Sequence, residues 1–214
     1  MSMKTNVDYW TELLANMPQS FKDWFSEEKK YLQKIITPDA KVLDVGCGDG
    51  RSVFDIISIT KNDVGIDHDE KTISSAKNNF SRYPSVKFIK MDATNLSFDD
   101  ESFDFIICMG TFANFAKDKF VVLKEMKRVL KKSGKIIISV YSEDAFAERI
   151  KIYKASRVKI KEIKDGTVVF DESLGDNISE QFSKKQLEDI FSRAYLHIED
   201  ITKLNIAYLC TLTK

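Results

Sequence analysis

A short apolar segment that runs directly into three closely spaced glycines constrains this chain more than any other feature. Residues 41–45 read Lys-Val-Leu-Asp-Val, and residues 46–50 read Gly-Cys-Gly-Asp-Gly. Such an apolar run is typical of a strand that is buried on both faces. The glycines allow the backbone to turn sharply and to approach a ligand, and a helix after them offers free N–H groups to an anion. The segment therefore predicts a strand, a ligand-binding loop and a helix.

Strands and helices alternate through the middle of the chain. Repeated strand–helix units with apolar strands indicate a parallel sheet that is covered by helices on both faces, a doubly wound α/β fold. The pattern predicts helices near 49–60, 69–81 and 117–132, and strands near 63–66, 86–90, 103–109 and 135–140.

The two ends of the chain extend this core. Apolar side chains at helical spacing in 8–36 predict two helices, separated by Pro18, that form a lid. Residues 158–163 and 167–170, with Asp165-Gly166 between them, predict a small inserted hairpin. A capping-box pattern at 183–186 predicts a helix, and strands at 196–201 and 204–212 should pair antiparallel across Thr202-Lys203 at one end of the sheet.

The length of 214 residues favours a single domain over two. We expect N-terminal helices in 1–38, a ligand-binding core in 39–142, an inserted lid hairpin in 143–182, and a terminal helix and strand pair in 183–214.

Composition argues against several classes of function. Lysine plus arginine and aspartate plus glutamate each number 33, so the chain lacks the positive charge that nucleic-acid binding usually needs, although a local basic face stays open. Cys47, Cys108 and Cys210 have no zinc-ligand spacing, which predicts buried thiols and no metal site. No apolar run reaches the roughly 18 residues that cross a bilayer, and the polar start does not resemble a signal peptide. We therefore expect a cytoplasmic protein without a membrane partner.

The glycine segment resembles the first motif of class I S-adenosylmethionine-dependent methyltransferases, in which an acid-ended strand precedes G-x-G-x-G. Asp67 ends the next strand, where the family carries an acid that accepts hydrogen bonds from the ribose hydroxyls. Asp92-Ala93 resembles the family's aspartate and backbone N–H that bind adenine, with Met91 beside the ring. Residues 108–111 end the fourth strand, where family carbonyls contact the methionyl amino group. All four loops should lie at the carboxyl edge of the sheet.

This resemblance covers about residues 39–142 and implies fold, cofactor and activity together. It implies a Rossmann-like, mostly parallel seven-stranded sheet with an antiparallel C-terminal strand. The cofactor would be S-adenosylmethionine, with S-adenosylhomocysteine as product, and the partner a small-molecule methyl acceptor. The residues expected to bind the cofactor are Asp44, Gly46, Cys47, Gly48, Gly50, Asp67, His68, Met91, Asp92, Ala93, Met109, Gly110 and Tyr9.

The glycine loop has one main alternative, the fingerprint G-x-G-x-x-G/A of nicotinamide dehydrogenases. That fingerprint needs a small third residue for close packing of helix on strand, and this chain has Arg51 there. The arginine favours the methyltransferase interpretation. Two further hypotheses stay open: a non-catalytic cofactor-binding or partner subunit, and a methyltransferase that acts on RNA or protein, which a basic stripe near the cofactor would indicate.

Residues for catalysis and acceptor binding are harder to identify. Methyl transfer from a sulfonium is an in-line displacement that needs a general base only when the acceptor arrives protonated. Tyr141 and His68 are weak catalytic candidates, since each follows a strand at the ligand edge. The sequence Met109-Gly110-Thr111-Phe112 lacks the Asn/Asp-Pro-Pro-Tyr/Phe motif, which disfavours nucleobase and glutamine-amide acceptors. The residues predicted to line an acceptor pocket are Trp10, Phe112, Phe115 and Tyr141. The alternative is that the first three fill the core beneath the lid and that Tyr141 lies in a solvated loop.

Overall fold

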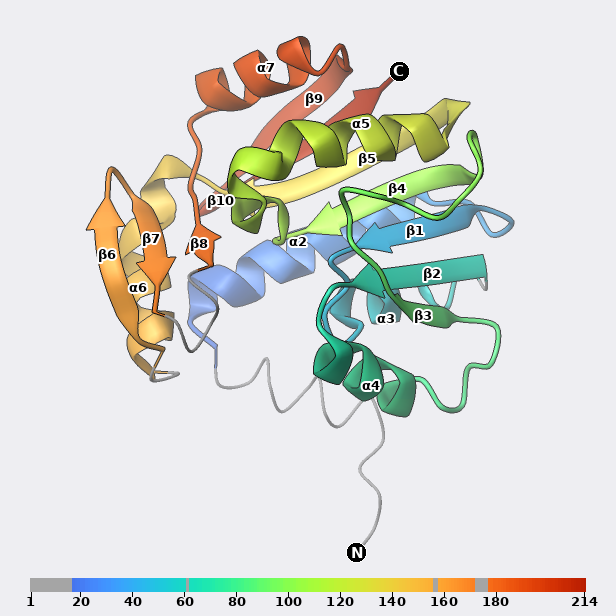
Figure 1. The fold of residues 1–214 in the computed structure, drawn as a ribbon, viewed down its shortest axis with the longest axis horizontal. Coiled ribbons are helices and arrows are strands. Elements are labelled where there is room, and N and C mark those ends of the chain that lie inside the picture. The colour runs from blue at the N-terminus through green and yellow to red at the C-terminus, as the bar shows by residue number, and fades with distance from the viewer. Residues whose placement is uncertain (1–16, 61, 156–157, 172–176) are drawn as a thin grey trace, which may run out of the picture.

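A seven-stranded sheet runs through the centre of the computed structural model, which describes residues 17–60, 62–155, 158–171 and 177–214 (Figure 1). The strand order is β3-β2-β1-β4-β5-β10-β9. Neighbours from β3 to β5 pair in parallel, and β10 runs antiparallel to both of its neighbours, β5 and β9. This arrangement confirms the predicted fold class. The strands are β1 (Lys41–Val45), β2 (Asn62–Asp67), β3 (Lys87–Lys90), β4 (Phe103–Met109), β5 (Leu130–Tyr141), β9 (His197–Leu204) and β10 (Ala207–Thr213).

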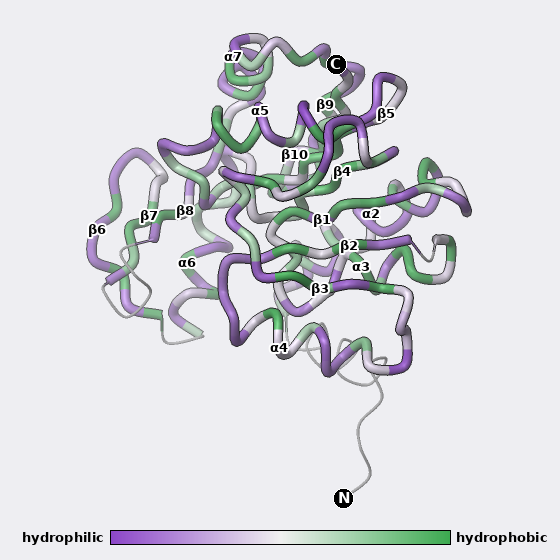
Figure 2. Tube along the Cα trace, turned by 45° about the vertical axis from the view of Figure 1, so that its right-hand side comes forward, coloured by the Kyte–Doolittle hydropathy of each residue, from purple (hydrophilic) through white to green (hydrophobic). Residues whose placement is uncertain are grey.

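Helices cover both faces of this sheet. On one face, α2 (Gln19–Ile35) and α3 (Arg51–Ile56) pack on side chains such as Val42 and Ile107. On the other face lie α5 (Lys119–Val129) and α7 (Lys184–Arg193), packed on side chains such as Leu43 and Ile138. The helix α4 (Glu70–Asn79) packs near β3. Figure 2 shows the central strands as mainly apolar, as expected for strands that are covered on both sides.

Local sequence signals explain where the helices begin. The α4 helix starts after Asp69, whose side chain accepts a hydrogen bond from the Thr72 backbone N–H at 2.7 Å. The α7 helix starts with the predicted capping box, because the Ser183 hydroxyl and the Gln186 amide each accept from the other residue's backbone N–H. The α2 helix starts directly after Pro18, as predicted.

The segment 143–182 contains more structure than the single predicted hairpin. Strands β6 (Ile160–Lys164) and β7 (Thr167–Phe170) form that hairpin, and β8 (Ile178–Ser179) adds a third strand. A helix that the sequence pattern missed, α6 (Phe146–Ala155), precedes them. Its only buried residue is Arg149, so no apolar stripe marked it as a helix.

Two predicted boundaries were wrong. The turn between the last two strands lies at Asn205-Ile206, not at Thr202-Lys203, because Asn205 accepts the left-handed backbone conformation (φ 49°). The helix predicted near 117–132 ends at Val129, and β5 begins directly after it instead of near 135. Gly134 therefore lies inside β5, where an added Cβ would stand 2.7 Å from the Asp104 carbonyl oxygen. The expected N-terminal lid is described only from residue 17, so Tyr9 and Trp10 lie outside the described residues. Among the described helices, none is both long and apolar enough to cross a membrane.

Candidate functional site

A cavity of about 290 Å³ opens at the edge of the sheet where β1, β2, β3 and β4 end. Each of these four strands contributes residues from the loop that follows it, and one further residue comes from just before β8. In a parallel sheet this carboxyl edge is the usual place for a ligand. The cavity is lined by Gly46, Gly48, Ile66, Asp67, His68, Met91, Asp92, Ala93, Thr94, Thr111, Asn114, Phe115, Asp118 and Asn177.

The three loop glycines have different roles. All three have positive φ, at 74° for Gly46, 56° for Gly48 and 100° for Gly50. A Cβ on Gly46 would stand 2.2 Å from the Thr111 side chain, and one on Gly50 would stand 2.4 Å from the Phe80 ring. A Cβ on Gly48 would meet nothing within 4 Å. Gly46 and Gly50 are therefore required by the fold, whereas Gly48 leaves open space beside the cavity for a ligand.

The Asp67 carboxylate is fixed at the mouth of this loop. Its Oδ2 accepts from the Gly48 backbone N–H at 3.2 Å, and its Oδ1 accepts from the Asp69 N–H at 3.0 Å. Each carboxylate oxygen has a second lone pair, so two further hydroxyl donors can be bound. The side chain is 13% exposed and lines the cavity. This geometry suits a vicinal diol such as a ribose. The neighbouring His68 is 78% exposed, with its Nδ1 3.4 Å from Asp67 Oδ1.

The loop after β3 supplies a second carboxylate and an apolar wall. Asp92 is exposed, and its Oδ1 accepts from both the backbone N–H and the hydroxyl of Thr94 at 2.8 Å. That contact leaves Oδ2 available to an external donor. Met91, held by a backbone hydrogen bond of 2.9 Å to the Asp67 carbonyl, places an apolar side chain beside it. A planar ring with an amino group would match these neighbours.

The loop after β4 closes the other side of the cavity. The Thr111 hydroxyl donates to the Gly46 carbonyl at 2.8 Å, which ties this loop to the glycine loop. Phe115 packs edge-on against Phe112, and Ala116 then turns the chain with φ 48°. Asp118 follows immediately before α5. The sequence analysis named Phe112 and Phe115 on this loop and included Thr111 only within the segment 108–111. It missed Asn114 and Asp118, although polar residues just after a strand at this edge are the available signal.

Asp44 lies beneath the glycine loop, not in the cavity lining. It is 1% exposed, and burial raises its pKa to about 7, while nearby Ser52 and Arg51 oppose that shift. Neither carboxylate oxygen meets hydrogen-bond geometry with a described partner. Arg51 instead binds Glu28 of α2, with Nη2 2.8 Å from Oε2. The arginine that argued against a dehydrogenase therefore attaches α2 to α3.

Several other predicted residues lie in the core instead of in the lining. Burial raises the pKa of the Cys47 thiol far above its usual range, so this cysteine is no nucleophile. Phe112 is fully buried among Phe115, Phe182 and Phe191. The predicted cofactor residues that do not line the cavity are Asp44, Cys47, Gly50, Met109 and Gly110.

Tyr141 belongs to a separate aromatic cluster at the end of β5. Its ring lies 5.1 Å from that of Trp24, and the Arg149 guanidinium lies 4.8 Å from its ring centre. Burial raises the pKa of the Tyr141 hydroxyl, which makes it a poor base. Trp24 itself is buried, and its indole N–H donates to the Ser139 hydroxyl at 2.6 Å.

Comparison with known proteins places the chain among enzymes. A family model described as a methyltransferase domain matches residues 36–195. The eEF1A lysine and N-terminal methyltransferase of Mus musculus is 31% identical over 138 residues, which cover 62% of this chain and 20% of that protein. The demethylmenaquinone methyltransferase of Staphylococcus aureus is 32% identical over 120 residues, which cover 52% and 49%.

Solved structures share the fold over nearly the whole chain. The PH0226 protein of Pyrococcus horikoshii superimposes with a TM-score of 0.70 at 28% identity and covers 92% of each chain. The match to the curated relatives is shorter, since this chain spans about a fifth of the mouse protein and about half of the staphylococcal one.

Proposed function

This chain belongs to the methyltransferase domain family, and on that premise we propose that it transfers a methyl group from S-adenosylmethionine to a small-molecule acceptor. The observation that carries the proposal is the cavity at the carboxyl edge of the sheet. All four loops in which the sequence resembles the family contribute to its lining. They do so with Gly46, Asp67, Asp92 and Thr111, one from each loop. Such convergence is expected of one ligand that touches every loop.

We assign the cofactor's parts to residues by their chemistry. Asp67 would bind both ribose hydroxyls, because each of its oxygens has a free lone pair after the contacts with Gly48 and Asp69. Asp92 Oδ2 would accept from the adenine amino group, with Met91 against the ring. Gly48 would leave room for the remaining part of the cofactor beside the loop.

For methyl transfer, the protein mainly has to align the cofactor with the acceptor and to exclude water. When bound, the cofactor supplies a methyl group with a sulfur leaving group. The chain's own residues orient the two reactants, and the apolar side chains of Ile66, Met91 and Phe115 keep water away from the cavity wall. Asn177, which precedes β8, also lines the cavity and supports a role for segment 143–182 as a lid.

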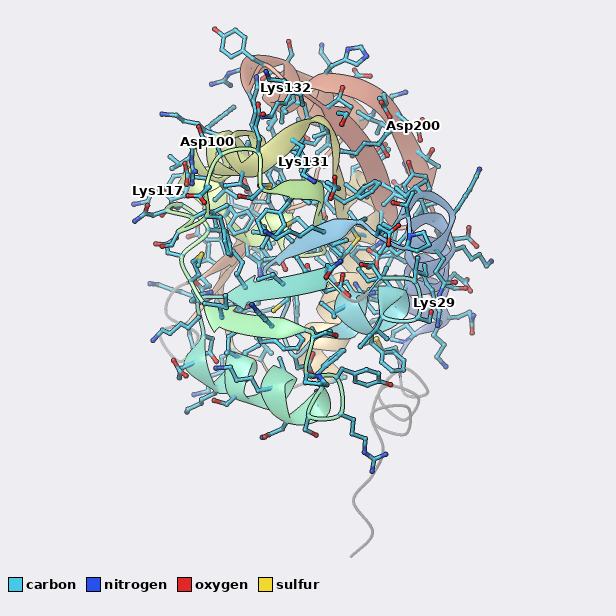
Figure 3. All side chains as sticks on the ribbon, turned by 90° about the vertical axis from the view of Figure 1, so that its right-hand side faces the viewer. Lys29, Asp100, Lys117, Lys131, Lys132 and Asp200 are labelled. Atoms are coloured by element: carbon cyan, nitrogen blue, oxygen red, sulfur yellow. The ribbon has the colours of Figure 1, made fainter. Side chains whose placement is uncertain are left out.

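The acceptor is the least defined part of the proposal. The named relatives act on a protein and on demethylmenaquinone, so their names do not agree on one acceptor. The balanced charge of the chain favours a small molecule, and the mouse relative favours a protein as the second candidate. An RNA acceptor has less support, because Lys29 and Lys117 lie on opposite sides of the view in Figure 3 and Lys131 pairs with Asp104 at 2.8 Å.

Calorimetry with S-adenosylhomocysteine tests the cofactor, and a radiolabelled methyl-transfer screen tests the reaction. We expect binding tighter than about 1 mM, which corresponds to about 4 kcal/mol. We also expect label to enter a metabolite pool rather than a protein or RNA pool. Absence of binding would overturn the proposal, and binding without transfer to any pool would favour a non-catalytic subunit.

A further inference from the structure

The β4 side of the cavity contains a carboxylate that the fold does not use. Asp118 stands directly before α5, where an aspartate normally caps the helix, yet its side chain makes no capping hydrogen bond. Within the described ranges it has no ion pair either, since neighbouring Lys119 donates to Glu180 at 2.9 Å. Asp118 nevertheless lines the cavity. A structural role therefore does not account for this side chain.

The charge of the cavity lining has one sign. Among the described lining residues there are three carboxylates and no lysine or arginine. The proposed function assigns Asp67 and Asp92, on the β2 and β3 side, to the cofactor. Asp118 remains on the side of β4, beside Phe115 and Asn114. An anionic acceptor would be repelled here, and a cationic group would be attracted.

Phe115 adds a second element that suits a cation. Its ring is held edge-on against the buried Phe112, with ring centres 6.1 Å apart, and it also faces the cavity. An aromatic face and a carboxylate on the same wall together bind alkylammonium groups, through a cation–π contact and a charged hydrogen bond. The Asn114 amide offers an additional acceptor on the same loop.

We propose that the methyl acceptor is an alkylamine, recognised by Asp118 and Phe115, an inference that rests on the proposed function. The ammonium first releases one proton to water. The nitrogen lone pair then forms the N–CH₃ bond while the electron pair of the C–S bond passes to sulfur. The products are the methylated ammonium and S-adenosylhomocysteine. Positive charge moves from sulfur to nitrogen in this step, so a carboxylate beside the nitrogen stabilises the charge that develops there.

Binding to the protein saturated with S-adenosylhomocysteine tests this inference without turnover. The probes are n-pentylamine, 1-pentanol and hexanoate, which have similar size and differ in charge, and binding is followed by ligand-observed NMR. We expect the amine to bind at least about tenfold more tightly than either counterpart. In Asp118→Asn the amine should lose about tenfold in affinity, while affinity for 1-pentanol and for S-adenosylhomocysteine stays unchanged.

The exposed Asp189 provides a matched control, because its only described side-chain contact is with Arg193 on α7. Asp189→Asn should bind all three probes as the natural chain does. Failure of S-adenosylhomocysteine to bind would overturn the proposed function. Normal cofactor binding with equal affinity for the three probes, or an Asp118→Asn variant without effect on the amine, would overturn this inference alone. A lysine peptide as a fourth probe distinguishes a protein amine from a free one.

Discussion

At the scale of single residues, the proposed ribose-binding role of Asp67 leads to the sharpest prediction. The carboxylate accepts from two backbone N–H groups and faces the cavity. Asp67→Ala should weaken binding of S-adenosylhomocysteine by roughly 10- to 150-fold, since charged hydrogen bonds contribute about 1.5–3 kcal/mol. Calorimetry measures the affinity and circular dichroism checks the fold. Asp189→Ala serves as the control, and an Asp67→Ala variant with full affinity would remove the assignment.

The buried Asp63 should make the free energy of unfolding depend on pH. It is 1% exposed at the start of β2, no described group hydrogen-bonds its oxygens, and burial followed by repulsion from Asp44 raises its pKa to about 7. The folded state thus holds a proton that the unfolded chain releases near pH 4, so this residue lowers the free energy of unfolding as pH rises from about 4 to about 7.

Asp63→Asn removes this dependence. The amide cannot ionise, so we expect the free energy of unfolding to rise by about 2–4 kcal/mol at pH 8 and to change little at pH 4.5, where the natural carboxyl is already protonated. Urea denaturation at the two pH values measures both changes. An equal effect at pH 4.5 and pH 8 would show that ionisation is not the cause.

Some of the predicted cofactor residues line the cavity and others lie beneath it, for a physical reason. Gly46, Gly48, Asp67 and Asp92 line the cavity because they follow strands at the carboxyl edge. Asp44 is still inside its strand, where side chains alternate between the two faces, and it points toward Arg51 and the α2–α3 side. Motif spacing does not tell which face a strand residue occupies.

At the scale of elements, α6 is attached to the small sheet by the buried Arg149 and by Tyr153, whose hydroxyl donates to Ser179 Oγ at 3.0 Å. Arg149 donates to the Gly166 and Ser179 carbonyl oxygens at 2.9 and 2.6 Å, and to Gln181 Oε1 at 3.0 Å. It has no carboxylate partner within the described part of the chain. The planar guanidinium fork reaches several acceptors at once, which an ammonium does not.

Arg149→Lys should therefore loosen the small sheet locally. We expect faster amide hydrogen exchange in β7 and β8, with exchange in β1 and β4 unchanged, because local opening costs less than global unfolding. Lys151→Ala on the same helix is the control, since Lys151 is exposed and contacts only Glu148 there. Unchanged protection of β7 and β8 would mean that other contacts hold this sheet.

The elements α6, β8 and α7 show which structures a sequence pattern can predict and which it cannot. The α7 capping box was visible in the sequence because Ser183 and Gln186 stand at fixed spacing. The α6 helix was not, because a helix that buries an arginine lacks an apolar stripe. The two-residue strand β8 is too short for any periodicity to be detected.

At the scale of the whole molecule, cofactor binding should stabilise the fold. A ligand that binds only the folded state at about 100 times its dissociation constant adds about 2.7 kcal/mol to the free energy of unfolding. For a chain of this size, that corresponds to a rise in melting temperature of roughly 5–10 °C. A thermal melt with S-adenosylhomocysteine measures it, with NAD as the control. If NAD raised the melting temperature and S-adenosylhomocysteine did not, the glycine loop would be a nicotinamide-binding loop of the dehydrogenase type.

The overall topology could be predicted from the sequence because each central strand is visible as an apolar run. Apolar runs such as Phe103–Met109 are buried on both faces, and the helices between them require right-handed parallel crossovers. The antiparallel pairing of β9 with β10 followed from their short connection, while the position of their turn depended on the backbone of Asn205. Topology is thus set by hydrophobic pattern, and boundaries are set by single backbone conformations.

The buried indole of Trp24 gives this chain an optical reporter. The chain has two tryptophans. Trp24 is hydrogen-bonded to Ser139 on the sheet, and its ring would stand 3.9 Å from a Cβ added to Gly110. Indole emission shifts with the polarity around the ring, so undocking of α2 would move the fluorescence of Trp24 toward longer wavelength. The attachment of this helix can therefore be followed in solution without a label.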